Sequence, residues 1–153
     1  MNAALLSLHV LTFAFTLWLG LYLLAGARNN GRLLFAGLGV SAYAITIFLS
    51  ALATATSNEF LNEAQWAFSF LPALFWTGTL IDLLPETLSA KTQLNRLWLY
   101  SVLPLSSLLF FFSLGTPLFM SSGLELSKYL FAATSLIPLF LAFTFVLRHY
   151  RQI

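Results

Sequence analysis

The chain has 153 residues, of which 59% are hydrophobic and only 8% are charged, and its formal net charge is +2. Soluble domains carry about 25% charged residues, and a fold of this size has too little interior to hide so many apolar side chains from water. The composition therefore excludes a soluble globular protein and favours one embedded in a bilayer. Seven basic residues are too few and too scattered to follow a nucleic-acid backbone, so nucleic acid is not an expected partner. The absence of cysteine excludes disulfides, thiolate metal sites and cysteine nucleophiles.

The first apolar segment, 4–25, ends in a small-residue sequence that resembles a signal-peptide cleavage site. A signal peptide also needs a basic start and a short apolar region. The first four residues carry no basic side chain, and the apolar run is long enough to cross a membrane. We therefore predict a retained transmembrane helix.

About 20 predominantly apolar residues are needed to cross the hydrocarbon core, and five segments qualify or nearly do. They predict an all-α transmembrane bundle that forms one domain over residues 1–153. The expected spans are approximately 4–25, 33–53, 66–84, 97–114 and 129–147.

Polar and turn-forming residues separate these spans. Residues 57–59 are expected to open a short interfacial turn that runs to Leu61, before the third span. Pro85 should end the third span, because proline disfavours helical geometry in the residue before it. Residues 115–117 should break the fourth span, which would leave the short apolar segment 118–120 at the membrane surface.

The basic residues predict an orientation, because loops rich in Lys and Arg stay in the cytoplasm. Six of the seven fall on one side of a five-span protein, together with Asp82 and Glu86. The six are Arg28, Arg32, Lys91, Arg96, Arg148 and Arg151. The other side has Lys128 with three glutamates. We expect an outside N-terminus, a cytoplasmic C-terminus and a location in the bacterial inner membrane.

Tyrosine and tryptophan residues lie near several of the expected helix ends, as is typical at the level of the lipid headgroups. Trp66 and Tyr129 begin outer ends, and Tyr22, Trp98 and Tyr150 lie near inner ends. Trp98 is therefore expected at the inner membrane interface.

His9 is the candidate cofactor ligand, since it lies one or two turns inside the first span. A polar imidazole in lipid is costly and is usually paired or used. Three interpretations stay open. His9 could be an axial ligand to a porphyrin-type pigment, it could sense protons, or it could bond to a neighbouring helix or water near the outer interface. The last is the favoured interpretation.

Asp82 and Glu86 are four residues apart near the inner end of the third span. They could relay protons or bind a cation, but Pro85 lies between them, and transporters place such groups nearer the bilayer midplane. We favour pairing with nearby cations, namely Lys91, Arg96 or the Arg28–Arg32 turn.

Small and hydroxyl residues recur on one stripe of the second span, where they let helices approach closely and hydrogen-bond across. Packing within the bundle is the first interpretation, and an interface with another subunit is the second. The stripe consists of Gly39, Ala42, Thr46, Ser50 and Thr54. Pro72, Pro104 and Pro138 lie inside the last three spans and should kink them.

The layout resembles the N-terminal multi-helix membrane region of bacterial sensor histidine kinases and diguanylate cyclases. The resemblance rests on four segments: residues 8–11 leading to 20–24, the turn at 28–32, residues 83–86 that end the third span, and the closing residues 148–151. That family usually has seven helices followed by cytoplasmic signalling domains. Five spans and no effector sequence depart from this pattern. The resemblance therefore implies either a fragment of such a receptor or a freestanding subunit derived from its membrane module, and signalling activity is not carried over to this chain.

No P-loop, dinucleotide-binding or metalloprotease motif is present. We therefore expect a non-catalytic module, sensory or scaffolding, that acts through contacts with other helices, lipid or ligand. The alternative is a small accessory subunit of a photosynthetic or respiratory membrane complex. The expected partners are the bilayer and other membrane helices. No cofactor is required, although lipid is expected and a pigment would fit the second interpretation.

Overall fold

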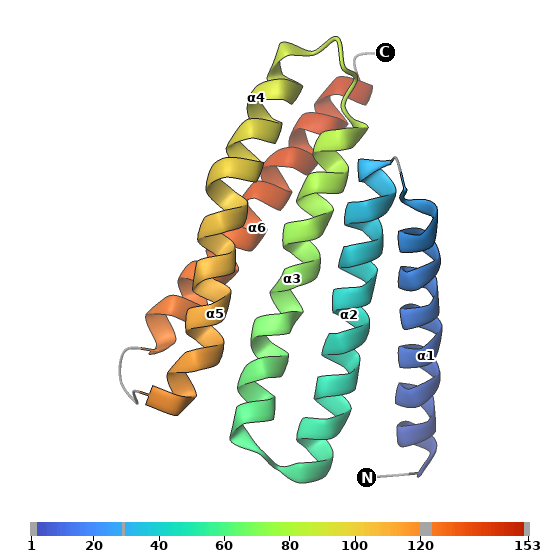
Figure 1. Ribbon diagram of the computed structural model, residues 1–153, viewed down its shortest axis with the longest axis vertical. Helices are drawn as coiled ribbons and strands as arrows, with labels where there is room; N and C mark the ends of the chain where they lie inside the picture. Colours follow the sequence, from blue (N-terminus) through green and yellow to red (C-terminus); the bar gives the residue numbers. More distant parts are fainter. Residues whose placement is uncertain (1–2, 29, 120–123, 152–153) are drawn as a thin grey trace.

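The computed structural model describes residues 3–28, 30–119 and 124–151, and throughout these ranges every regular element is a helix (Figure 1). Five helical segments in this part of the chain are long and apolar enough to cross a membrane, which confirms the predicted all-α architecture with five spans. The elements are α1 (Ala3–Gly26), α2 (Gly31–Thr56), α3 (Glu59–Leu83), α4 (Ser89–Leu97), a π-helix η1 (Trp98–Val102), α5 (Leu103–Phe119) and α6 (Leu124–Tyr150).

The helices stand in a row, with α1 at one edge and α2 between α1 and α3 (Figure 1). On the other side of α3, the continuous segment α4–η1–α5 and the tilted helix α6 complete the bundle. The two chain ends lie at opposite ends of the bundle. Helix α3 is therefore the central element, since it packs against α2, α5 and α6, whereas α1 packs mainly against α2.

The connection between α2 and α3 is shorter than the sequence indicated. Ser57 has a left-handed backbone (φ 51°, ψ 34°), and the Asn58 side chain accepts a hydrogen bond from the Phe60 N–H at 2.9 Å. These two residues end one helix and cap the next. Helix α3 consequently begins at Glu59 instead of residue 66, and the predicted separate turn through Leu61 is wrong.

The fourth span also differs from its predicted bounds of 97–114. Helix begins at Ser89 and runs through a π-helical turn, in which the Leu103 N–H bonds to the Trp98 carbonyl. Pro104 follows directly, and a proline lacks an N–H and crowds the preceding turn, which favours irregular hydrogen bonding there.

The break expected at residues 115–117 is also wrong, because α5 continues to Phe119. Membrane helices tolerate Gly and Pro within their length. Of the segment 118–120 that was expected at the membrane surface, the first two residues belong to α5, and Met120 lies outside the described residues.

Trp98 lies in the core of the bundle, since only 1% of its surface is exposed. Its ring meets Phe35 of α2 edge-on, with ring centres 4.7 Å apart, and it packs with Ile81 of α3 and Ala142 of α6. Gly78 provides the space: a Cβ at that position would lie 2.8 Å from Cη2 of Trp98. Trp98 is therefore buried by packing between residues that are distant in sequence, and its expected depth at the inner membrane interface stays a prediction.

Candidate functional site

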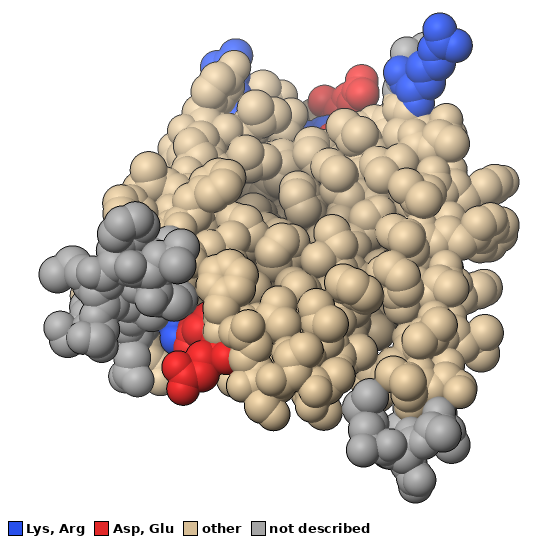
Figure 2. All heavy atoms as spheres, turned by 60° about the horizontal axis from the view of Figure 1, so that its bottom comes forward, with Lys and Arg blue, Asp and Glu red and all other residues tan. Residues whose placement is uncertain are grey.

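The charged side chains lie at the two ends of the bundle. Figure 2 shows them at two edges of the molecule, separated by a broad band without charge. The C-terminal ends of α1 and α6, the N-terminal end of α2 and helix α4 all lie at one end (Figure 1). This end, which we call the cationic end, carries the six basic residues predicted to share one side: Arg28, Arg32, Lys91, Arg96, Arg148 and Arg151.

Asp82 organises part of the cationic end through its backbone carbonyl. Arg32 donates its Nε–H to this oxygen at 2.7 Å, and Lys91 donates from Nζ at 3.3 Å. The last carbonyls of a helix have no intrahelical donor, so cations stabilise them. The two predicted basic partners therefore do reach Asp82, but they bind its main chain. Glu86 is exposed.

The Asp82 carboxylate lies at the start of α2. A Cβ at Gly31 would be only 2.6 Å from Oδ2 of Asp82. The N-terminus of a helix carries partial positive charge, which favours a nearby carboxylate. Asn30 caps the same turn, since its side chain accepts a hydrogen bond from the Arg32 N–H at 3.1 Å. The structural role of Asp82 is thus to join the start of α2 to the end of α3.

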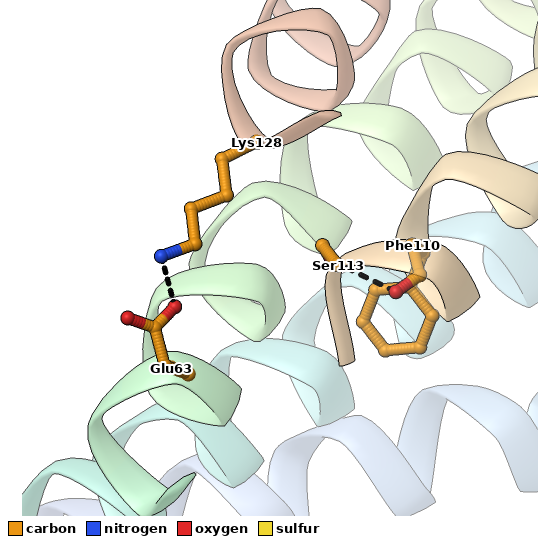
Figure 3. A network of polar contacts seen from close by, with 4 residues as sticks. All are labelled: Glu63, Phe110, Ser113 and Lys128. Carbon is orange, nitrogen blue, oxygen red and sulfur yellow. Dashed lines mark hydrogen bonds and ion pairs between the residues drawn. The ribbon is translucent and has the colours of Figure 1, made fainter. Parts of the chain in front are cut away.

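An ion pair at the opposite end was not predicted from the sequence. Lys128 of α6 contacts Glu63 of α3, and their side chains are only 18% and 29% exposed (Figure 3). The pair borders a cavity of about 230 Å³ that Trp66 and Tyr129 also line. The two residues are 65 positions apart, so only the presence of opposite charges on the same predicted side could have indicated their contact.

Ser113 of α5 donates its hydroxyl to the Phe110 carbonyl at 2.8 Å (Figure 3). The hydroxyls of Ser106 and Ser135 are fully buried and have no hydrogen-bond partner among the described residues. Buried hydroxyls of this kind are costly unless paired with protein or water.

His9 is half-buried on the side of α1 that packs against α2. Phe13, one turn further on, contacts Phe48 of α2 with ring centres 5.4 Å apart. Gly20 follows on the same side, where a Cβ would lie 2.4 Å from the Ser41 hydroxyl oxygen. The imidazole is thus directed towards the contact between the two helices, and its proposed role as a pigment ligand stays a hypothesis.

The small-residue stripe of α2 lies partly inside the bundle. Gly39 is buried, and a Cβ there would be 3.1 Å from Nε1 of Trp76 on α3. Thr46 donates its hydroxyl to the Ala42 carbonyl at 3.0 Å, and Thr54 donates to Ser50 at 2.8 Å. The threonine hydroxyls therefore bond within α2 instead of to a neighbouring helix.

A groove of about 320 Å³ lies where the π-helix and α5 face α6. One wall includes Leu97 and Ser101, and the other includes Ala133, Thr134 and Pro138. Pro138 has no N–H, so the Thr134 carbonyl lacks its helical donor. Two helix irregularities, the π-turn and Pro138, thus border one opening. The groove was not predicted from the sequence, although Pro138 in its wall and Pro104 beside the π-turn are both visible there.

The outer face of α1 is an exposed row of large apolar residues. Leu11, Phe15, Trp18 and Tyr22 are spaced by four, three and four positions, which places them on one side of the helix. Trp18 is 60% exposed and Tyr22 is 66% exposed. Their rings stack with centres 5.7 Å apart, and Phe15 lies 6.2 Å from Trp18. We call these four residues the α1 face.

No protein-family model, curated protein or solved structure matches this chain. The resemblance to sensor membrane regions stays a prediction. The features that can indicate a function are therefore those of the chain itself: the α1 face, the groove and the two charged ends.

Proposed function

We propose that the chain is a non-catalytic membrane scaffold that binds a helix of another membrane protein through the α1 face. The observation that carries this proposal is the packing of α1. This helix stands at the edge of the row and packs mainly against α2, which leaves its aromatic side uncovered. Only 6% of its most apolar 18-residue window is buried.

The identity of the exposed residues supports a protein partner over lipid alone. Tryptophan and tyrosine prefer the headgroup level of a bilayer. Trp18 lies eight residues before the end of α1 at Gly26, or about 12 Å along the helix. Its indole is therefore within the apolar band, where aromatic residues are strong contributors to protein–protein contacts. A row of rings on one rigid helix provides a large contact area at low entropic cost.

A photoreactive amino acid tests this contact in the native membrane. Placed at Phe15, it should give a discrete crosslinked product with another protein after irradiation. Placed at Leu108 of α5, which is also exposed, it should give only diffuse lipid adducts. Equal products from both positions, or lipid adducts alone from Phe15, would contradict the scaffold role.

The same surface would serve an accessory subunit, which is the second interpretation. A stable subunit should be purified with its partner at a fixed stoichiometry after gentle solubilisation. A scaffold should instead exchange one partner protein for another. The mass of the crosslinked product, compared with the mass of the purified complex, separates the two.

We also propose that the cationic end faces the cytoplasm of a bacterial cell and that the chain resides in the inner membrane. The support is the distribution of charge. Six of the seven basic residues are at one end, and basic residues near membrane helices are retained on the cytoplasmic side. The ion-paired end with Glu63 and Lys128 would then face outwards.

A further inference from the structure

We propose that the groove between α5 and α6 binds one acyl chain of an anionic phospholipid, whose phosphate is held by Arg148 and Arg151 at the cationic end. The site is separate from the α1 face, since α5 and α6 lie on the far side of α3 from α1 (Figure 1). It would be present whether or not the scaffold role is correct.

The groove fits an apolar chain. Its walls are formed almost entirely by apolar side chains, among them Leu97, Leu105 and Leu130, and it is about 320 Å³ in volume. The Thr134 hydroxyl is satisfied within its own helix, since it donates to the Phe131 carbonyl at 3.0 Å. A hydrocarbon chain would therefore meet mostly apolar walls, although Thr134 also has a main-chain carbonyl that lacks its helical donor.

A continuous stripe on α6 connects the groove to the cationic end. Thr134, Ile137, Leu141, Thr144 and Arg148 are spaced alternately by three and four residues, so they share one side of the helix. Ile137 and Leu141 are both more than half exposed. This stripe is the path that a lipid chain would follow along the surface of the protein.

The length of the stripe matches one leaflet. Arg148 lies 11 residues beyond Ile137, which is about 16 Å of helix. Half the hydrocarbon thickness of a bilayer is about 15 Å. A lipid with its phosphate beside Arg148 would thus reach the groove with the distal part of its chain.

The positive charge where the stripe reaches the cationic end determines which lipid headgroup binds. A second depression there is lined by Arg148 and Arg151 together with Thr144, Leu147 and Tyr150. The guanidinium of arginine offers a planar fork of donors that binds phosphate oxygens in pairs. Two arginines without a carboxylate among the lining residues favour a lipid with net negative charge over a zwitterionic one.

The test is native mass spectrometry of the full chain in detergent, titrated with phosphatidylglycerol or with phosphatidylcholine of identical chains. The unchanged protein should retain phosphatidylglycerol about tenfold more strongly, as expected for a charge-assisted contact. Arg148→Gln should remove most of this preference. Arg28→Gln is the matched control, because Arg28 is exposed at the same end but belongs to the connection between α1 and α2.

A second variant tests the groove itself. Ala133→Phe adds a ring to the groove wall and should weaken retention of both lipids, whereas Leu108→Phe on the exposed side of α5 should not. Equal retention of the two lipids by the unchanged protein would overturn the proposal. So would equal losses from Arg148→Gln and Arg28→Gln. If Ala133→Phe changes the oligomeric mass but not lipid retention, the groove binds a helix and the lipid site is wrong.

Discussion

Trp98 shows how one side chain fixes the middle of the bundle. Its indole contacts α2, α3 and α6 at once, and the space for it exists because position 78 has no side chain. Protein interiors are packed so tightly that one added methyl group has to displace its neighbours. Gly78 and Trp98 are therefore a matched pair.

Gly78→Ala should destabilise the folded protein by about 1–3 kcal/mol, because its Cβ would lie 2.8 and 3.0 Å from two indole carbons. The measurement is thermal unfolding in detergent micelles. Gly26→Ala is the control, since its nearest contact would be an ordinary 3.8 Å. Trp98→Phe removes the indole carbons that clash and should recover part of the loss in the double variant. Additive losses would contradict this packing.

Residue-level prediction from sequence was weakest where contacts join distant positions. The sequence placed Trp98 at the start of a span, but the helix begins nine residues earlier at Ser89. The sequence also could not show that Gly78 would meet Trp98 from another helix. The sequence likewise predicted that Arg32 and Lys91 lie beside Asp82, but it did not show that they bind the main-chain carbonyl instead of the carboxylate. A carbonyl at a helix end becomes an acceptor only through the local geometry.

At the scale of whole elements, apolar length was sufficient to find the five helical segments that are long and apolar enough to cross a membrane, and the helix boundaries were less predictable. The α2–α3 connection closes in two residues because Ser57 adopts a left-handed backbone and Asn58 caps α3. The π-helix arises from hydrogen bonding beside Pro104, and no apolar pattern encodes it.

The ion pair between Glu63 and Lys128 joins two elements, α3 and α6, at the end away from the cationic side (Figure 3). Both side chains are mostly buried, so removal of one charge leaves the other without compensation. Lys128→Met should therefore lower the free energy of unfolding by about 2–4 kcal/mol. The double variant Lys128→Met with Glu63→Gln should recover most of this loss in thermal unfolding. If the double variant is less stable than Lys128→Met, the pair does not hold α6 to α3.

Two properties combine at the scale of the molecule: the face in Figure 2 has an apolar band without charge, and the two ends of the bundle differ in charge. The band follows from composition, and the separation of charge follows from an odd number of spans with basic residues in alternate connections. The surfaces proposed to act, the α1 face and the α5–α6 groove, lie on opposite sides of the central helix α3. The chain would thus be able to contact a protein and a lipid at the same time.

The most direct test of five spans with the proposed orientation uses the absence of native cysteine. Thr56→Cys and Thr87→Cys each introduce a single exposed thiol, and the two thiols lie at opposite ends of the bundle. Position 56 is beside the α2–α3 connection, and position 87 is beside α4 at the cationic end. In intact bacterial cells, a membrane-impermeant maleimide should label the Thr56→Cys variant but not the Thr87→Cys variant, and cell disruption should expose both. Labelling of both variants in intact cells, or of Thr87→Cys alone, would contradict the proposed orientation.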